Sequence, residues 1–574
     1  MKVFLKTLPE VRLRSCGALL ALGFAYLIAG LGGCSSDNTA AGTPGAGNPA
    51  SGAQSAEQPR YGGRLVIGVQ QEPERLSEIL NATVTNNLVC NLIFSKFVKY
   101  DDEMRLIPDL ITEIPTVENG GIAADFLTYT YHLRQNARWH DGKPVTSGDV
   151  KFTYEIIMDP GVSVESREGW DIIDAVKTPD THTVVFHLKQ PYPDFVAETF
   201  YDESVLPAHI LREQKGEKFH ISPYHHRPVG CGPFKVEKWV KGSHLELVRN
   251  EHYYGEGPYL DGIIFKFIAN ENTMLVQLKT GEIDLFDNIS SEFIDQAATI
   301  ANARVFSTPT LMYEHLDLNM DNAILRDKRV RQAIAFATDK DVVAEQVYRG
   351  FAQVAQLDEH PSSKYFDPGA AAGARYDPVQ ARRLLRDSGW IDTDGDGIRE
   401  KDGRDLALTI SATTGNPNRE RTQLVLQEQF RAVGIDLRIK NFNATVLYGS
   451  YEDGGILKRG KFDIAMYAWL SSPEPATKEA LYGSHNIPPN GQNHPRIRHA
   501  ELTRLLEEGA REVDEAERIR IYRRVEQILV EEVPVIPLFW YTAVDVCTRD
   551  LKNYRPNPTQ SADTWNANTW YLAD

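Results

Sequence analysis

Residues 131–152 read YHLRQNARWHDGKPVTSGDVKF, and this stretch contains the clearest local fold signals in the chain. Apolar side chains alternate with polar ones between Tyr129 and Leu133, which predicts a half-buried β-strand. Asp141-Gly142 then predicts a tight turn. Thr146 or Ser147 follows with the side chain of a helix N-cap, ahead of apolar residues at helical spacing. A strand, a turn and a helix within so few residues indicate a mixed α/β protein.

Composition narrows the class of protein further. The chain has 574 residues, of which 42% are hydrophobic, so it is long enough for several compact units with sizeable cores. It carries 62 basic and 79 acidic side chains, a formal net charge of -17. That balance argues against nucleic acid as a partner, because nucleic-acid binding requires a basic face.

The N-terminus resembles a bacterial lipoprotein signal. Basic residues start the chain, and an uncharged, mostly apolar stretch runs from Ser15 to Gly33. Leu31-Gly32-Gly33-Cys34 resembles a lipobox, in which the cysteine is lipidated and becomes the new N-terminus; a transmembrane helix is the alternative reading of the apolar run. Residues 1–33 are therefore expected to be the signal peptide and 34–59, rich in Ser, Gly, Ala, Asn and Pro, a flexible tether.

Two helices in the second half have clear start signals. Asp377-Pro378 places an N-cap before a proline at the first helical position, and Gly389 supplies the stop. Asp514 precedes a helix whose apolar stripe includes Ile521 and Val525. The charged residues from Glu515 to Arg524 are expected to form its solvated face.

Signatures of catalysis are missing from the sequence. There is no GxSxG, HExxH, P-loop or dinucleotide-binding glycine pattern, so we expect no enzyme activity and no cofactor. Asp392, Asp394 and Asp396 resemble the start of a calcium-binding loop. Gly403 stands where such a loop needs a bidentate glutamate, and Glu400 or Asp402 is a possible substitute. The loop is a candidate calcium site, with a plain polar turn as the alternative.

A series of motifs along the chain resembles the family 5 extracellular solute-binding proteins, which include the oligopeptide, dipeptide and nickel receptors of ABC importers. The motifs occur in one order from the first third of the chain to its C-terminus: YHLR 131–134, WHDGKPVT 139–146, DVKF 149–152, PVGCGPF 228–234, RNEHYY 249–254, GEID 281–284, VRQAI 330–334, LLRDSGW 384–390 and PVIPL 534–538. Trp139 and the turn after it are expected to pack and cap the fold rather than to contact a ligand.

This resemblance implies an α/β periplasmic-binding-protein fold of type II, in the large class with an extra inserted domain and a hinged cleft between two lobes. The implied division is lobe I at 60–105, 205–308 and 533–574, the inserted domain at 106–204 and lobe II at 309–532. A solute bound in the cleft would stabilise the closed form through contacts to both lobes.

The resemblance also indicates where the solute binds. In peptide-binding members a Trp on the second lobe is followed three residues later by an Asp that pairs with the peptide amino group. Trp469 matches that Trp, but Ser472 stands where the Asp belongs, and a hydroxyl cannot neutralise a buried ammonium. Glu474 is a possible replacement. The expected ligand-binding residues are Tyr313, Glu314, Tyr467, Trp469, Ser471, Ser472, Glu474 and Asn493.

The expected function is that of a monomeric receptor held outside the cytoplasm by a lipid at Cys34. It would capture a peptide-like solute and deliver it to the membrane subunits of an ABC importer. A nickel chelate or an opine-like solute remains open as the ligand. A surface module for sensing, or for holding unfolded chains on the same fold, is the alternative function. Among Cys90, Cys231 and Cys547 one disulfide is permitted, with no pair favoured.

Overall fold

The computed structural model describes residues 58–573 except 82, 165, 166, 168, 200–202, 374, 452 and 560–562. The signal peptide, the lipidation site Cys34 and nearly all of the tether, which were inferred from sequence, lie outside the described residues. Gln58–Asp574 forms one compact unit. Within the described part of the chain, no helix has both the length and the apolar character required to span a bilayer.

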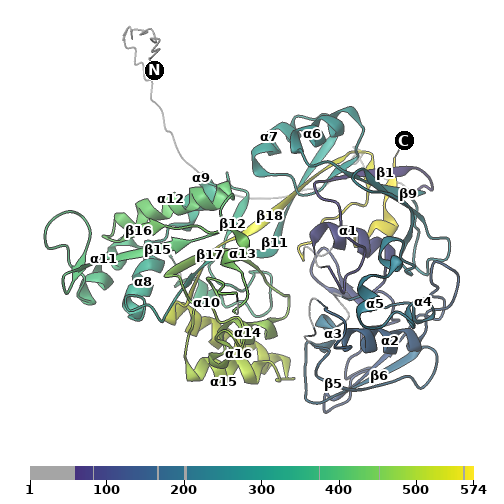
Figure 1. Cartoon of the computed structure of the whole chain (residues 1–574), viewed down its shortest axis with the longest axis horizontal. Coiled ribbons are helices and arrows are strands. Elements are labelled where there is room, and N and C mark those ends of the chain that lie inside the picture. The colour runs from purple at the N-terminus through teal and green to yellow at the C-terminus, as the bar shows by residue number, and fades with distance from the viewer. Residues whose placement is uncertain are drawn as a thin grey trace, which may run out of the picture. The chain divides into compact units, whose positions relative to one another are not determined.

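One large mixed sheet runs through the molecule (Figure 1). Its strand order is β16-β15-β17-β11-β18-β10-β1-β9-β8-β7, and β12 pairs with β18 beside this path. The strands are β1 Arg64–Val69, β7 Phe234–Val240, β8 His244–Arg249, β9 Gly262–Phe267, β10 Leu285–Phe286, β11 Ala303–Leu318, β12 Ala352–Val354, β15 Ala407–Ser411, β16 Asp436–Ile439, β17 Ile464–Leu470 and β18 Val535–Thr548.

The two long strands β11 and β18 join the halves of this sheet. They pair with each other antiparallel, and their register shifts between Pro309 and Tyr313 and again between Glu314 and His315. One end of the β11–β18 pair contributes Ala303 and Val546 to an apolar cluster with the helices after β9. The other end contributes residues to a separate core. Strands β11 and β18 both run from one half of the sheet to the other. Their irregular middle forms the hinge of the two-lobed fold.

Two main hydrophobic cores define the lobes. We call residues 58–308 and 543–573 lobe I and residues 314–539 lobe II, because each part has one large apolar cluster of its own, with smaller clusters in addition. The residues of β18 up to Phe539 pack in lobe II, whereas the division inferred from sequence assigns them to lobe I. Because strand β18 runs from one lobe to the other without interruption, no loop marks the boundary between the lobes.

The opening stretch folds as its pattern predicts. Strand β4 (Thr128–His132) pairs with β6 in the three-stranded sheet β4-β6-β5, and Trp139 is fully buried. Helix α2 (Ser147–Ile157) begins after Thr146, whose backbone N–H donates to the Asp149 carboxylate at 2.8 Å. The turn at Gly230 fits closely against helix α1 (Val84–Ile93), since a Cβ at Gly230 would lie 1.9 Å from a backbone oxygen at the end of this helix.

The remaining strands are β2 Val98–Tyr100, β3 Leu106–Pro108, β5 Ile173–Lys177, β6 Thr183–Leu188, β13 Glu400–Lys401, β14 Arg404–Asp405, β19 Leu551–Lys552 and β20 Tyr571–Leu572. The helices of lobe I are α1 Val84–Ile93, α2 Ser147–Ile157, α3 Phe195–Glu198, α4 Ala208–Leu211, α5 Glu217–His220, α6 Glu271–Thr280 and α7 Ile294–Ala298. Those of lobe II are α8 Lys328–Ala337, α9 Lys340–Gln346, α10 Pro368–Ala371, α11 Pro378–Asp387, α12 Pro417–Arg431, α13 Ala444–Leu447, α14 Lys478–Tyr482, α15 Ala500–Gly509 and α16 Glu515–Glu532.

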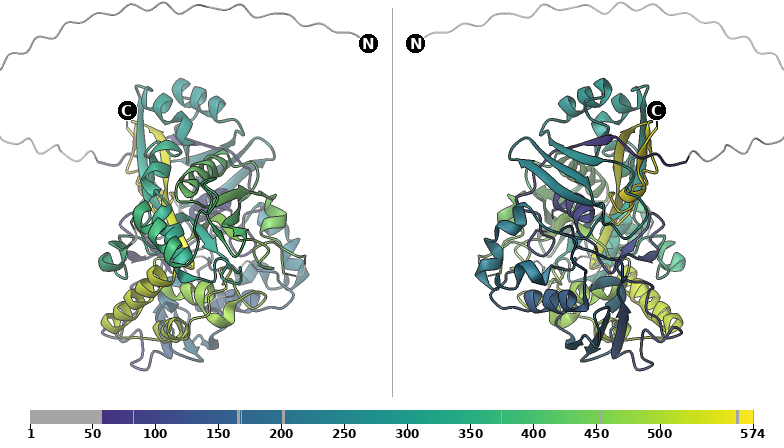
Figure 2. Two further views of the ribbon diagram at one scale, coloured as in Figure 1. Left: turned by 90° about the vertical axis from the view of Figure 1, so that its left-hand side faces the viewer. Right: turned by 90° about the vertical axis from the view of Figure 1, so that its right-hand side faces the viewer.

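The helix starts inferred from sequence are confirmed. Asp377 accepts hydrogen bonds from the backbone at the start of α11, and Asp514 accepts one from Glu517 N at 2.8 Å at the start of α16. Helix α15 packs against both α14 and α16, and the three helices lie at one end of lobe II (Figure 1); Figure 2 gives two further views of the chain. This helical layer supports the loop after β17, where the candidate site begins.

Candidate functional site

The end of strand β17 and the middle of β11 form one wall of the candidate site. The two strands pair antiparallel, which sets Trp469 directly opposite Tyr313. Ile464 and Met466 pack into the main core of lobe II, while Trp469 packs on the other face against smaller clusters. Alternation along the strand therefore places Trp469 away from the main core, as the sequence pattern predicts.

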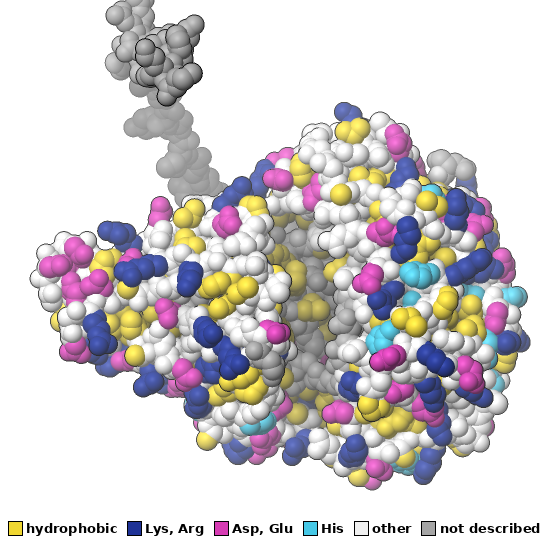
Figure 3. All heavy atoms as spheres, in the orientation of Figure 1, with side chains coloured by type: hydrophobic (Ala, Val, Ile, Leu, Met, Phe, Trp, Pro, Cys, Tyr) yellow, Lys and Arg dark blue, Asp and Glu magenta, His cyan; other side chains and the backbone are white. Residues whose placement is uncertain are grey.

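A narrow pocket with a cavity volume of about 10 Å³, roughly the space of one water molecule, lies against this wall. Tyr313 and Trp469 provide its aromatic surface, and Ser471 and Glu474 enter it from the loop after β17. Its other lining residues are Asp358, Pro475, Thr477, Lys478 and Leu481. Four residues inferred from sequence thus meet at one cavity. The space-filling view shows the surface hollowed between the two halves of the described unit (Figure 3).

The loop after β17 contacts lobe I directly. The Ser472 hydroxyl donates to the carboxylate of Glu198, at the end of helix α3 in lobe I. Glu474 accepts hydrogen bonds from the Tyr365 hydroxyl at 2.8 Å and from Arg518 at 2.9 Å. Ser472, which stands where peptide-binding members have an Asp, therefore faces an acidic side chain.

Arg518 connects the two lobes. Its guanidinium lies 2.9 Å from Glu474 in lobe II and 2.5 Å from Asp194 in lobe I, and both Arg518 and Asp194 are buried. Burial raises the pKa of Asp194 to about 7, and the nearby charge of Glu474 adds to the rise while Arg518 opposes it. The stability of a buried cation between two carboxylates depends strongly on the geometry of the contacts. This bridge therefore favours one relative position of the lobes.

A second buried ion cluster centres on Lys478. Its ammonium lies 2.7 Å from Asp358, 2.7 Å from Glu526 and 3.3 Å from Glu359. Burial alone would lower the pKa of Lys478, but the three carboxylates outweigh it and raise this pKa well above its ordinary value. Burial raises the pKa of Glu526 well above its usual range, and Asp358 adds to the effect. Burial also raises the pKa of Glu359, so the protonated forms of Glu526 and Glu359 are favoured and offset part of the negative charge around Lys478.

Three other residues inferred from sequence are occupied by internal contacts. Glu314 is fully buried and holds Arg419 through two contacts of 2.7 and 3.0 Å. Tyr467 donates to Asp317 at 2.5 Å. The Asn493 side chain is fully buried and bonds backbone groups of its own loop. These contacts favour structural roles, and ligand contact by these three residues stays a prediction.

Sequence reasoning missed Arg518, which was expected on the solvated face of its helix. That expectation is wrong for this residue, because Arg518 is buried in the bridge between the lobes. The signal was present: Arg518 lies three residues before Ile521 and seven before Val525, which puts it on the same apolar stripe. Glu526 is buried on this helix as well. A charge at an apolar stripe position indicates a buried ionic partner.

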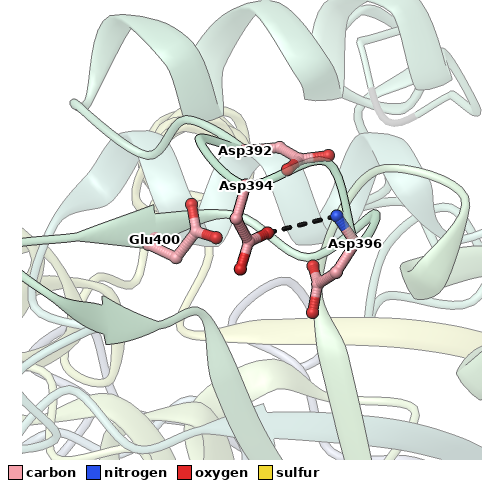
Figure 4. A group of neighbouring side chains, drawn as sticks. All are labelled: Asp392, Asp394, Asp396 and Glu400. Atoms are coloured by element: carbon pink, nitrogen blue, oxygen red, sulfur yellow. Dashed lines mark hydrogen bonds between the residues drawn. The ribbon is translucent and has the colours of Figure 1, made fainter.

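The acidic loop inferred as a calcium candidate does bring its carboxylates together, with Glu400 as the fourth member (Figure 4). Three of the four are exposed. Each also accepts from nearby backbone N–H groups, as Asp392 does from Gly395 at 2.7 Å and Asp394 from Asp396 at 3.1 Å. This arrangement suffices for a polar turn, and calcium binding here stays a prediction.

The cysteines do not contribute to the site. Cys90, Cys231 and Cys547 are all buried free thiols, so the permitted disulfide is not formed among them. Burial raises the pKa of Cys231 to about 12, which keeps this thiol protonated and unreactive at neutral pH.

Comparison with known proteins finds the fold of this chain among solute-binding proteins. The oligopeptide-binding protein AppA of Bacillus subtilis is 27% identical over 522 residues, covering 91% of this chain and 93% of that protein. The solved structure of that AppA in complex with a nonapeptide has a TM-score of 0.72 at 26% identity and covers 90% of this chain and 100% of that one. NikZ of Campylobacter jejuni, solved with Ni(L-His), has a TM-score of 0.71 at 27% identity, covering 88% and 99%.

A family profile gives the assignment directly. Residues 105–486 match the bacterial extracellular solute-binding proteins, family 5 Middle. This range includes the sheet β4-β6-β5, both register shifts of strand β11 and the loop after β17. The match covers well over half of the chain and agrees with the two-lobed fold. The chain therefore belongs to the family 5 bacterial extracellular solute-binding proteins.

Proposed function

We propose that this protein is the receptor of an ABC importer and captures a peptide-like solute between its lobes. The observation that carries this proposal is the position of the cavity, where an aromatic wall at Trp469 lies beside the Arg518 bridge between the lobes. A solute held there contacts the elements that move on closure, so its binding energy stabilises the closed form. The receptor then presents this form to the importer and carries out no chemistry itself.

A free edge of strand β17 supports a peptide as the solute. On the side away from β11, β17 pairs with β15 only as far as Ala465. Among the described strands, none continues that pairing toward Trp469. An extended peptide adds to such an edge through main-chain hydrogen bonds, which do not depend on its sequence.

The direct test is to identify what the purified protein carries. The full chain is isolated under native conditions and denatured, and the released small molecules are analysed by mass spectrometry. Peptides are the expected result, and adding the recovered peptides back should raise the melting temperature. Release of nickel with a small chelator, or of an opine-like compound, would instead support the alternative ligands. Equal stabilisation by unrelated unfolded chains would support a holding function.

Trp469→Ala should weaken peptide binding at least about 30-fold, because a central aromatic anchor contributes about 2 kcal/mol or more. Isothermal titration calorimetry with a recovered peptide measures this change. Trp239→Ala is the matched control, since Trp239 is also partly buried but packs on lobe I away from the cavity. Equal affinities for the two variants would remove Trp469 from the binding site.

A lipid anchor at Cys34 is part of the same proposal. Its support is the lipobox-like sequence and the polar tether after it, together with a family whose members act outside the cytoplasm. An acylated cysteine would keep the receptor near the importer while the tether lets it move. The mass of the N-terminal peptide from membrane-bound protein tests this, and an unmodified N-terminus upstream of Cys34 would contradict it.

A further inference from the structure

A second cavity, with a volume of about 140 Å³, lies in lobe II. Helices α8, α9 and α16 and the start of strand β18 contribute its walls, which are largely apolar and include Ala335, Phe336, Leu529, Val530, Ile536 and Pro537. Asp358 is the one lining residue that this cavity shares with the pocket at Trp469. An apolar cavity of similar volume accommodates one benzene ring, so the space suits a ligand of about that size.

Lys340 brings a positive group to this cavity without an acidic partner. Its side chain is buried, and its ammonium donates to the backbone oxygen of Ala355 at 2.8 Å. Within the part of the chain that the structure describes, Lys340 forms no ion pair, and Asp341, an exposed neighbour on the same helix, is the charge that acts on it. A buried cation without a counter-ion is unfavourable, so Lys340 can accept an anion from outside the chain.

Two more polar side chains line the cavity without a partner that would occupy them. Gln356 follows Ala355, the residue that Lys340 contacts, and its oxygen Oε1 is enclosed and has no hydrogen-bond partner among the described residues. Rotation of the terminal torsion exchanges the oxygen and the nitrogen of this amide, so Gln356 can also present a donor. Arg375 is exposed at the rim and forms no ion pair with any described residue. The cavity therefore offers two positive groups and an amide to a ligand.

The two acidic residues that line the cavity are already engaged elsewhere. Asp358 and Glu526 both accept hydrogen bonds from Lys478, each at 2.7 Å. Burial raises the pKa of Glu526 well above its usual range, which favours its neutral form. The negative charge beside the cavity is thus committed to Lys478, whereas the positive charge of Lys340 is not committed to any side chain.

Apolar walls and one uncompensated cation together determine the chemistry of the ligand. An apolar body gains free energy when it leaves water for such walls, and a carboxylate forms a strong charge-assisted hydrogen bond with an ammonium group. We propose that this cavity binds a small monocarboxylate whose apolar body is about the size of one ring and whose carboxylate pairs with Lys340. The proposal does not depend on which solute binds at Trp469.

Benzoate is the probe, and calorimetry with the full chain measures its binding. We expect one site with a dissociation constant of about 0.1–1 mM, as is reasonable for a ligand of this size. Lys340→Met retains most of the side-chain volume and should weaken binding at least about 10-fold. Lys440→Met is the matched control, because Lys440 is an exposed lysine of lobe II outside the cavity. Ala335→Phe should abolish binding by filling the cavity, whereas Trp469→Ala should bind benzoate like the wild type.

The dependence on charge is tested with related ligands and with pH. Benzyl alcohol, which lacks the charge, should bind at least about 10-fold more weakly than benzoate, and benzylamine should not bind. Burial lowers the pKa of Lys340 to about 7, and a bound carboxylate should raise it again. Binding should therefore take up protons and weaken as the pH rises above about 7. Lys340→Met retains Asp341, Asp358, Glu526 and Arg375, so loss of this pH dependence in the variant assigns it to Lys340.

Four results would each overturn the proposal. They are equal benzoate affinities for the wild type and Lys340→Met, tighter binding of benzylamine than of benzoate, loss of binding in Trp469→Ala but not in Ala335→Phe, and no binding at about 10 mM benzoate. Circular dichroism shows whether each variant folds. If Lys340→Met does not fold, Ala335→Phe and the comparison of benzoate with benzyl alcohol decide the question.

Discussion

Replacing Lys478 with methionine should lower the free energy of unfolding by about 3–5 kcal/mol, because a buried ion cluster that loses its cation leaves its acids uncompensated. Lys478 is the common partner of Asp358, Glu359 and Glu526, all of them buried. Methionine preserves most of the side-chain volume, so the loss reports on charge rather than on packing. Urea denaturation followed by circular dichroism measures it.

Lys328→Met is the control for this experiment. Lys328 also lies 3.0 Å from each of two carboxylates, but its side chain is 39% exposed. Water screens that pair, so the expected cost is about 0–1 kcal/mol. The double variant Lys478→Met/Asp358→Asn should be more stable than Lys478→Met alone, because it removes one stranded charge. Equal losses for Lys478→Met and Lys328→Met would show that burial of the cluster adds nothing.

Replacing Arg518 with methionine should shift the ligand-free protein toward the open form and weaken solute binding about 30-fold. The estimate is about 2 kcal/mol, at the low end for a buried hydrogen-bonded charge pair. The low end applies because Asp194 has a raised pKa and can take up a proton when its partner is lost. Small-angle scattering should show a larger radius of gyration, and calorimetry should show the lower affinity.

Arg520→Met tests whether any arginine of helix α16 would have the same effect. Arg520 lies two residues away, and its side chain is 70% exposed and pairs only with Glu517 of its own helix within the described residues. Neither the scattering curve nor the affinity should change in this variant. A radius of gyration for Arg518→Met equal to that of the wild type would mean that the bridge does not hold the lobes together.

The sequence was informative about the fold because local signals and family motifs agree with each other. The strand before Leu133, the cap at Thr146 and the proline after Asp377 all occur where the patterns predict them. These features depend on neighbouring residues, so short-range chemistry determines them. The crossing within β18 was less predictable, because a strand that passes through two cores has no break in its pattern.

The site was only partly predictable for a physical reason. Trp469 and Glu474 lie on a segment with a family motif, so their neighbourhood could be inferred. Lys478 and Arg518 act through acids distant in sequence, including Asp358 and Asp194, and only the folded chain brings these together. A single sequence shows that a charge occupies an apolar stripe, but it does not show which partner neutralises it.

The continuous passage of β11 and β18 through the molecule constrains how it moves. Lobes joined by loose linkers swing freely, whereas a hydrogen-bonded ribbon of two strands resists bending in its own plane and yields mainly by twisting. The register shifts near Pro309 and Tyr313 interrupt this ladder, so rotation should concentrate there. The ribbon would then favour a narrow range of lobe angles, and the receptor would return to that range after each delivery.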